Sequence, residues 1–382
     1  MQFYRGDGFY ERLGVKPIIN ARSWVTVAGG SIIPEPAKRA MEEASRHFVD
    51  MHELNSKAGE VIARITGAEA GLVTAGSGAG MLLQAAACIT GRDPAKVWKL
   101  PNTKGMSNQI VIHRMQRVSY DRNFRAAGAK IVEIGDTGIT EPWELEDAIN
   151  QKTAAVAYIV GPVKSGTLSL EKVVEIAHSH EVPVIVDAAA MLPPVENLTK
   201  YINAGADMVS FSGGKGIMGP QSTGVLCGRK DLIEAAAMNA APNSQGIGRP
   251  AKVSKENIAG LITALELFVD TDYSAVQAGW RQMCVYVVDK LQGIDHVRAE
   301  LSEARPELEN STSGHTRALI FIDKDHPNLS EAEVIEKLLE GDPPISVGVA
   351  GPQGGIAVVP VNLHDGEEEI IGNRLREILS SE

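Results

Sequence analysis

Cysteine, aromatic residues and long hydrophobic runs are all scarce in this sequence of 382 residues. The three cysteines, Cys88, Cys227 and Cys284, are odd in number and far apart, which argues against a disulfide framework or a Cys-x-x-Cys metal site. Aromatic residues make up only 5% of the chain, so Ala, Gly, Val, Ile and Leu must fill most of the core. No run of about 18 apolar residues occurs and the first residues lack a signal-peptide pattern, so we expect a soluble, cytoplasmic protein.

Positive charge is also in deficit. Lys and Arg number 37 against 48 Asp and Glu, which gives a formal net charge of -11. Non-specific binding to nucleic acid depends on Lys and Arg that neutralise phosphates, so this balance predicts no nucleic-acid partner. Because the sequence has no apolar run long enough to span a membrane, we also expect no membrane partner. The length and the 44% hydrophobic content instead predict globular domains with a substantial core.

The chain shows two different sequence patterns, one before and one after about Ser254. Up to about Ser254, short β-branched runs alternate with longer amphipathic ones, which predicts βαβ units and a mainly parallel sheet. Two long helical patterns and then a mixture of strands and helices follow. We therefore predict a large α/β domain over residues 20–260, linking helices over 261–290 and a small C-terminal α+β domain over 291–382. Residues 1–19 show no clear core pattern and are treated as an N-terminal segment.

The expected strands are short apolar runs between turn signals. In the large domain they lie at 71–74, 109–112, 130–134, 154–160, 182–187, 207–211 and 223–227. In the small domain they lie at 296–301, 316–322, 345–349 and 356–360, with helices at 330–339 and 367–379.

A glycine-rich segment, Thr74-Ala75-Gly76-Ser77-Gly78-Ala79-Gly80, follows the first of these strands and opens a helix. Small residues at a helix N-terminus let backbone N–H groups approach an anion, so Gly76, Ser77 and Gly78 could cradle a phosphate. The segment lacks the Lys-Ser/Thr ending of a P-loop and matches a dinucleotide fingerprint only loosely. A tight turn that binds no ligand is the structural alternative.

Two other strands end in residues that can carry chemistry. Asp187 ends an apolar run, and because open parallel sheets bind ligands at the carboxyl ends of their strands, it should face a cleft. It could instead serve only as a helix cap or turn former. Another run leads through Ser212 and two glycines to Lys215, for which a solvated loop lysine is the alternative.

Together these three features match what a pyridoxal phosphate enzyme requires. The Lys215 amine would form a Schiff base with the cofactor aldehyde, Asp187 would pair with the pyridinium nitrogen, and backbone N–H groups would hold the phosphate. A carboxylate beside the ring nitrogen raises the pKa of that nitrogen and keeps it protonated, so the ring can accept electrons. The Ser212 hydroxyl could add a contact to the phosphate. The predicted cofactor is therefore pyridoxal 5'-phosphate.

Four blocks of sequence carry a family resemblance. They are residues 13–21, 65–70, 211–215 with 219–224, and 246–253, of which the last two are the most specific. On these blocks nearly the whole chain resembles the selenocysteine synthase-like family of fold-type I pyridoxal phosphate enzymes, which includes D-glucosaminate-6-phosphate ammonia-lyase. The resemblance implies an aspartate-aminotransferase-like fold, with Lys215 as the Schiff-base lysine and Asp187 as the pyridinium partner. It also implies that Ser77, Gly78 and Ser212 bind the phosphate.

One residue departs from the pattern of ordinary class V aminotransferases. These enzymes carry a histidine directly before the lysine, whereas Gly214 stands here, as in the selenocysteine synthase branch. Transamination is therefore less expected. Selenocysteine synthases carry an extra N-terminal domain that grips tRNA, whereas only 12 residues precede Leu13. With the acidic balance, this makes a tRNA-bound substrate an unexpected one.

The resemblance also implies a group that stacks on the cofactor ring after the strand at 109–112. His113 is the first candidate and Gln116 competes with it, although either could be structural. Four arginines follow closely, Arg114, Arg117, Arg122 and Arg125. They could attract a substrate carboxylate or phosphate, or they could form a solvated helix face.

Basic residues elsewhere are candidates for binding the substrate. Arg249 and Lys252, with Lys255, would suit an anionic substrate or the cofactor phosphate of a neighbouring subunit. They could equally support the start of the helix that follows. Arg22 and Arg317 are further candidates for a carboxylate. No set of residues has metal-ligand spacing, so we predict no metal site.

The expected activity is that of a lyase on a small-molecule amino acid substrate. Lys215 would remove the α-proton, Asp187 would hold the ring charge, and a β-substituent would leave to give a 2-oxo acid and ammonia. The resemblance adds an amino sugar acid phosphate as a substrate class, and a homodimer or larger assembly with active sites at the subunit interface. Racemisation, aldol cleavage and a selenocysteine synthase-like transfer stay open, as does a regulatory protein that binds the cofactor without catalysis.

Overall fold

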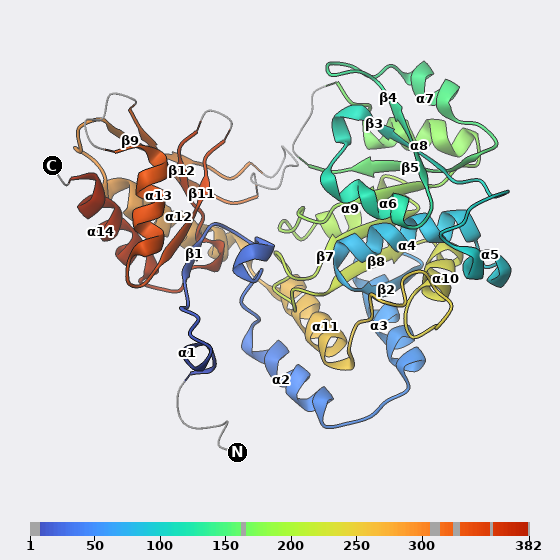
Figure 1. The fold of residues 1–382 in the computed structure, drawn as a ribbon, viewed down its shortest axis with the longest axis horizontal. Coiled ribbons are helices and arrows are strands. Elements are labelled where there is room, and N and C mark those ends of the chain that lie inside the picture. The colour runs from blue at the N-terminus through green and yellow to red at the C-terminus, as the bar shows by residue number, and fades with distance from the viewer. Residues whose placement is uncertain (1–7, 162–165, 306–313, 324–328, 352–353, 381–382) are drawn as a thin grey trace. The chain divides into compact units, whose positions relative to one another are not determined.

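The chain folds into two compact units, drawn as a ribbon in Figure 1. The computed structural model describes residues 8–161, 166–305, 314–323, 329–351 and 354–380. The larger unit comprises Ser31–Thr271 and Pro306–Gly314. The other, here called the C-terminal unit, comprises Met1–Gly30, Asp272–Arg305 and His315–Glu382.

A seven-stranded sheet forms the centre of the larger unit. Its order is β2-β8-β7-β6-β5-β3-β4, and every neighbouring pair is parallel except the two that contain β8. The strands are β2 (Ala70–Thr74), β3 (Gln109–His113), β4 (Lys130–Ile134), β5 (Thr153–Ile159), β6 (Val184–Asp187), β7 (Met208–Ser212) and β8 (Gly224–Gly228). The predicted α/β fold with a mainly parallel sheet is confirmed, and each strand lies within two residues of its expected position.

Helices cover both faces of this sheet. One hydrophobic core joins Met208 of β7 to α4 (Gly76–Thr90), α6 (Arg122–Ala126) and α10 (Lys230–Asn239). Phe211 lies on the opposite face of β7, because side chains alternate along a strand, and its ring contacts Tyr201. That residue belongs to α9 (Asn197–Asn203), which together with α3 (Met51–Thr66) and α8 (Leu170–Ser179) packs on this second face. The remaining helices are α2 (Glu35–Ser45), α5 (Pro94–Lys99), α7 (Pro142–Ala148) and α11 (Lys255–Asp270).

The strand directions bring several predicted site residues to one edge of the sheet. His113, Asp187 and Ser212 are the last residues of three parallel strands, β3, β6 and β7. The carboxyl ends of parallel strands meet at one edge, where open α/β sheets bind their ligands. Thr74, at the end of β2, lies in register with Gly224, which in turn lies in register with Ser212. The start of α4, two residues after Thr74, therefore lies at this edge as well.

The C-terminal unit contains a second sheet of five strands, in the order β1-β11-β12-β10-β9. They are β1 (Ile19–Ala21), β9 (Val297–Ser302), β10 (Arg317–Ile322), β11 (Ile345–Val349) and β12 (Ile356–Val358). Residues of α12 (Tyr273–Lys290), α13 (Glu331–Glu340) and α14 (Glu367–Leu379) share one hydrophobic core with this sheet. α1 (Phe9–Arg12) precedes β1. The predicted small α+β domain is present.

Two features of the units do not follow from the order of the elements along the chain. The N-terminal strand β1 pairs in parallel with β11, so a segment without a clear core pattern completes the C-terminal sheet. α11 belongs to the larger unit and α12 to the C-terminal unit, although both fall largely within the range expected for linking helices. None of the helices within the described ranges combines the length and the hydrophobicity of a membrane span.

Candidate active site

The glycines beside Lys215 are packed so closely that no side chain fits in their place. A Cβ at Gly214 would lie 2.3 Å from Gln221 Cα, and a Cβ at Gly216 would lie 2.2 Å from Leu192 O. Contacts this short against backbone atoms require the chain to move, which is costly in a close-packed interior. The histidine that ordinary class V aminotransferases carry before the lysine therefore cannot occupy this loop.

A residue that the sequence analysis did not identify holds the same loop. Ser31 Oγ lies 2.7 Å from Lys215 O and 3.1 Å from Gly214 O, and its hydroxyl donates to these carbonyls. Met218 N also donates to Lys215 O, at 2.8 Å. Ser31 is 184 residues away from Lys215 in the chain, so no local spacing could have identified it.

Removing the Ser31 hydroxyl should loosen the lysine loop. We expect Ser31→Ala to lower the free energy of unfolding by about 1 kcal/mol, the usual net value of one hydrogen bond. We also expect kcat to fall about tenfold, because small displacements of a catalytic group are expensive. Steady-state kinetics and chemical denaturation measure both, with Ser31→Thr as the control that keeps the hydroxyl. A folded Ser31→Ala variant with an unchanged kcat would show that this contact does not position Lys215.

Asp187 is buried, and the half-buried Lys215 lies near enough that each charge shifts the pKa of the other. Asp187 is only 6% exposed, and its Oδ1 accepts a hydrogen bond from Ala189 N at 3.0 Å. Burial raises the pKa of Asp187 to about 6, against the opposing effects of the Ala189 N–H and the Lys215 charge. Burial likewise lowers the pKa of Lys215, and the Asp187 charge partly opposes this shift. The structure thus brings together the two residues on which the prediction depends most.

The start of α4 presents backbone N–H groups at the same edge of the sheet. The N-cap residue is Ala75, whose side chain has no atom that could accept a hydrogen bond from the helix. The first backbone N–H groups of a helix lack intrahelical acceptors, so Gly76, Ser77 and Gly78 can donate to an anion. A Cβ at Gly80 would lie 2.3 Å from Ser210 Oγ, so the helix begins directly against β7. An amine, a buried carboxylate and an uncapped helix N-terminus at one edge fit pyridoxal phosphate.

His113 and Gln116 lie farther along this edge. His113 is fully buried, its Nε2 accepts a hydrogen bond from Leu168 N at 3.4 Å, and burial lowers its pKa to about 4. Its ring therefore has no accessible face in this structure. Gln116 Oε1 accepts from Ile159 N at 3.2 Å, and Ile159 lies in register with Asp187. Which of the two residues stacks on the cofactor ring stays a prediction.

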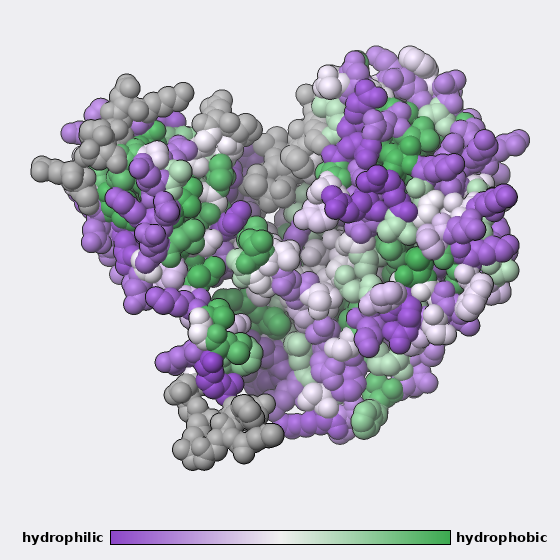
Figure 2. All heavy atoms as spheres, viewed as in Figure 1, coloured by the Kyte–Doolittle hydropathy of each residue, from purple (hydrophilic) through white to green (hydrophobic). Residues whose placement is uncertain are grey.

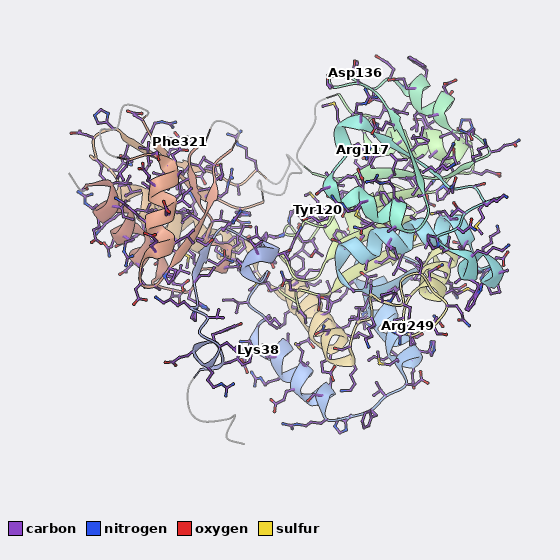
Figure 3. The ribbon with its side chains drawn as sticks, in the orientation of Figure 1. Lys38, Arg117, Tyr120, Asp136, Arg249 and Phe321 are labelled. Carbon is purple, nitrogen blue, oxygen red and sulfur yellow. The ribbon has the colours of Figure 1, made fainter. Side chains whose placement is uncertain are left out.

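Three of the four arginines that follow β3 are engaged by other residues, and the fourth, Arg125, is exposed on α6. Arg114 forms an ion pair with Glu133 at 3.1 Å, and Arg117 pairs with both Glu133 and the buried Asp121. Arg122 Nε donates to Ser119 O at 2.7 Å. These contacts favour a structural role for Arg114, Arg117 and Arg122 over binding of a substrate anion. Figure 3 shows Arg117 well separated from Arg249, so the two basic regions are distinct.

Arg249 and Lys252 line a cavity of about 490 Å³ in the larger unit. Val73, the residue before the end of β2, lines it too, so the cavity lies close to the start of α4. Lys255 is engaged within the protein, because its Nζ donates to Ala44 O at 2.6 Å and pairs with Glu256.

The two other arginines predicted to bind substrate lie in the C-terminal unit. Arg22 is exposed next to β1. Arg317 opens β10, donates to Ser302 Oγ at 3.3 Å and has a pKa lowered by burial. The substrate-binding roles of Arg249, Lys252, Arg22 and Arg317 stay predictions.

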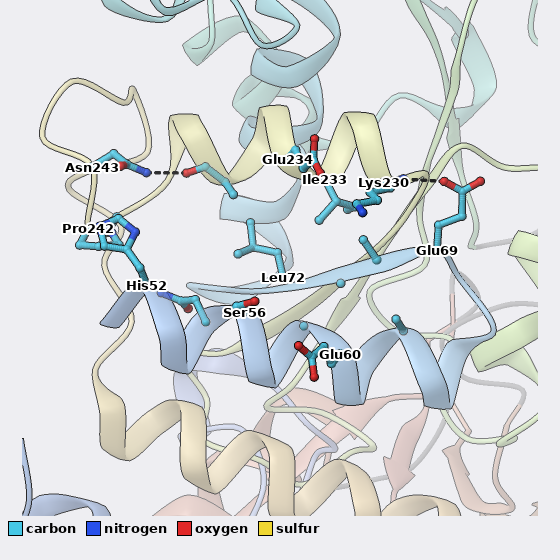
Figure 4. Close-up of a pocket in the computed structure, with 17 residues that line it drawn as sticks. His52, Ser56, Glu60, Glu69, Leu72, Lys230, Ile233, Glu234, Pro242 and Asn243 are labelled. Carbon is cyan, nitrogen blue, oxygen red and sulfur yellow. Dashed lines mark hydrogen bonds between the residues drawn. The ribbon is translucent and has the colours of Figure 1, made fainter. Parts of the chain in front are cut away.

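A second cavity, of about 550 Å³, lies between α3, β2 and α10 (Figure 4). Glu60, Glu69 and Glu234 line it together with Lys230, whose backbone N–H donates to Glu69 Oε2 at 2.9 Å. None of the predicted site residues lies in its wall. This cavity adjoins the one that Arg249 lines, because Asn55, Ala241 and Pro242 border both.

Known proteins resemble this chain over almost its full length. A family model described as aminotransferase class-V matches residues 104–317. The chain is 33% identical over 378 residues to D-glucosaminate-6-phosphate ammonia lyase from Salmonella typhimurium. The aligned region covers 97% of each chain. It is 32% identical over 385 residues to a 5'-C-glycyluridine monooxygenase-decarboxylase from a Streptomyces species, which covers 97% of this chain and 92% of the relative. An L-seryl-tRNA(Sec) selenium transferase from Nitratidesulfovibrio vulgaris is 27% identical and covers 70% of this chain and 58% of the relative.

A solved structure agrees with these relationships. The structure of D-glucosaminate-6-phosphate ammonia-lyase matches with a TM-score of 0.85 at 32% identity, over 98% of this chain and 99% of the other. The family resemblance and the pyridoxal phosphate cofactor expected from the sequence are thereby confirmed. The chain belongs to the aminotransferase class-V family of fold-type I pyridoxal phosphate enzymes, in the group that includes D-glucosaminate-6-phosphate ammonia-lyase.

Proposed function

We propose that this protein is a pyridoxal phosphate-dependent ammonia-lyase that converts an amino acid with a leaving group on its β-carbon into a 2-oxo acid and ammonia. The observation that carries this proposal is the likeness to D-glucosaminate-6-phosphate ammonia-lyase over nearly the whole of both chains. The proposed substrate is accordingly an amino sugar acid phosphate. A relative of similar identity is named for oxygenation and decarboxylation, so identity alone does not select the reaction.

Three groups of this chain would hold the cofactor. The Lys215 amine would attach to its aldehyde carbon, the Asp187 carboxylate would face its ring nitrogen, and the N–H groups that open α4 would bind its phosphate together with Ser212. When bound, pyridoxal phosphate supplies an electron sink for the negative charge that develops at the substrate α-carbon. The buried Asp187 carboxylate would hold a proton on the ring nitrogen and so support that charge.

Lys215 would also move the α-proton. Burial lowers the pKa of its amine, which increases the fraction of neutral amine that can accept a proton. Lys215 would then return a proton to the hydroxyl that leaves the β-carbon as water. A second water molecule is consumed when ammonia is released, so the net reaction removes only ammonia from the substrate.

Basic side chains would bind the acidic groups of such a substrate. Arg249 and Lys252 border a cavity close to the start of α4, where their charges would suit a phosphate. Arg22 and Arg317 are the candidates for the α-carboxylate, which a guanidinium binds through two parallel hydrogen bonds.

We further propose that the protein acts as a homodimer or a larger assembly. Phe48 is fully exposed and Val49 is half exposed, and both line the same cavity as Arg249. Figure 2 shows hydrophobic residues that interrupt the largely hydrophilic surface of the larger unit. Exposed apolar residues at a rim of polar ones mark surfaces that bind a partner. A second copy over this region would remove Phe48 from water and enclose Arg249 at the interface.

The proposed reaction can be tested with the purified protein loaded with pyridoxal phosphate. We expect D-glucosaminate 6-phosphate to release ammonia and a 2-oxo acid in equal amounts, measured with coupled enzymes that detect each product. Exchange of the α-proton with deuterated solvent, followed by NMR, should accompany turnover. Exchange without either product would instead indicate racemisation, and release of carbon dioxide would indicate decarboxylation; either outcome would contradict the lyase proposal.

A further inference from the structure

One buried glutamine connects three elements of the proposed site. Gln84, in the middle of α4, has no exposed surface. Its Nε2 donates to Val186 O at 3.0 Å and to Met208 O at 3.3 Å. Val186 comes directly before Asp187 in β6, and Met208 is the first residue of β7, which leads to Lys215. The helix that carries Gln84 opens with the segment proposed to hold the cofactor phosphate.

An amide side chain is unexpected at position 84, because the residues around it are apolar. The neighbouring residues of α4, among them Met81 and Ala85, pack in the apolar core of the larger unit. A buried amide is costly unless its polar atoms are paired, and Gln84 Oε1 has no hydrogen-bond partner among the described residues. An apolar side chain of similar volume would avoid that cost, which indicates that the amide serves something other than stability.

The two hydrogen bonds of Gln84 can both form at only one position of α4 along the sheet. Both partners are carbonyl oxygens, so the NH₂ group of Gln84 has to face them. Successive helical turns are about 5.4 Å apart, so a shift of α4 by one turn would break both bonds. Nearer the start of the helix, Ser210 Oγ donates to Ser77 O at 3.4 Å. α4 is therefore attached to β7 at its start and to both β6 and β7 at its middle.

We propose that Gln84 is a positioning residue that sets the spacing between the phosphate-binding start of α4 and the pair Asp187 and Lys215. Eight residues separate Gly76 from Gln84, which corresponds to about 12 Å of helix. A cofactor bound at its phosphate, its aldehyde and its ring nitrogen tolerates little change in that spacing. Gln84 has no exposed surface and would act through α4, β6 and β7, not by contact with cofactor or substrate. The inference rests on the roles proposed above for Asp187, Lys215 and the start of α4.

Asn239 provides a matched control for this proposal. It is also fully buried in the larger unit, and its Nδ2 donates to Thr90 Oγ1 at 3.1 Å and to Ala235 O at 3.0 Å. Its Oδ1, like Gln84 Oε1, has no hydrogen-bond partner within the described part of the chain. Asn239 connects helices only, whereas Gln84 reaches the strands that end at the site. Gln84→Met and Asn239→Leu thus remove equivalent amides with different connections.

The experiment measures cofactor binding and stability in both variants. We expect Gln84→Met to weaken the affinity for pyridoxal phosphate about tenfold in a fluorescence titration of the apoprotein. The pH at which the visible absorbance of the bound cofactor changes should shift as well, because the ring nitrogen no longer sits correctly against Asp187. Asn239→Leu should leave affinity and absorbance as in the wild type, although its denaturation midpoint changes.

Two results would overturn the proposal. Gln84→Met could fold and bind the cofactor with wild-type affinity and absorbance, or both variants could lose affinity equally, which would indicate general loosening. If Gln84→Met does not fold, Gln84→Asn keeps the amide on a side chain one methylene shorter, and normal cofactor affinity in that variant would also refute a positioning role. These measurements use no substrate, so a wild-type protein without lyase activity would contradict the proposed function and leave this test valid.

Discussion

Replacing Lys215 with alanine is expected to lower kcat for ammonia release by about four orders of magnitude, the upper range for one acid–base group. The variant loses both the amine that attaches to the cofactor and the base that takes the α-proton. The Lys215 side chain is half-buried beside Asp187, and a water molecule in its place would be a weaker base and could not attach to the cofactor. Initial rates of ammonia and 2-oxo acid release, measured at saturating cofactor, give the change in kcat.

A second measurement identifies the attached residue directly. Borohydride reduction of the wild-type protein with its cofactor, followed by peptide mass spectrometry, should place the cofactor on Lys215. Lys215→Ala should show no reduced attachment, whereas Lys96→Ala, which alters an exposed lysine of α5, should behave as the wild type. Attachment at another lysine in the Lys215→Ala variant would show that the residue is wrongly assigned.

Asp187→Asn is expected to lower kcat by about 10²–10³-fold, the loss typical when one preorganised electrostatic group is removed from an active site. Asparagine keeps the size of the side chain and one oxygen that can accept from Ala189 N, but it cannot balance a positive ring nitrogen. Proton abstraction should therefore slow more than substrate binding weakens, so that kcat falls while KM changes little. Asp147→Asn, at an exposed position of α7, is the matched control.

The same substitution should have the opposite effect on the stability of the protein without cofactor. Burial raises the pKa of Asp187 from 3.8 to about 6, so the folded state binds a proton more tightly than the unfolded state. The stability from this group is fully present below pH 3.8 and is lost as the pH rises through about 6. Asp187→Asn cannot ionise, so its apoprotein should unfold at a higher temperature than wild-type apoprotein above pH 6, with the difference vanishing near pH 3.8. Equal melting temperatures across this range would mean that Asp187 is not buried as a carboxylate.

Local sequence patterns predicted most of the helices and strands, because the spacing of apolar residues in a segment shows which of its faces is buried. β4 and α14 lie at the expected residues, since alternating or helical periodicity identifies the buried face of an isolated segment. β1 was missed because it has only three residues, too few for a period, and its burial depends on pairing with β11. Periodicity likewise gave no information on whether α11 and α12 belong to one unit or to two.

The arginine-rich segment after β3 shows that a local sequence pattern also cannot reveal whether a charged side chain is paired. In the sequence, Arg114 and Arg117 are two positive charges in an acidic protein and equally suit a substrate anion or a solvated surface. Glu133, on the next strand of the sheet, pairs with both of them. Whether a charge is free to bind a ligand depends on neighbours brought by the fold, which a linear pattern does not contain.

The amino-acid sequence alone determined the chemistry: a lysine among glycines, an aspartate at a strand end and a glycine-rich helix start are local features, and the parallel-sheet rule places them at one edge. Tertiary structure alone decided how these groups are held. Gly214 is required because Gln221 passes 2.3 Å from where its Cβ would be, and Ser31 reaches the lysine loop across 184 residues. Gln84 reaches two strands in the same way. Close approaches between distant segments follow from the packed fold as a whole, so no window of sequence could reveal them.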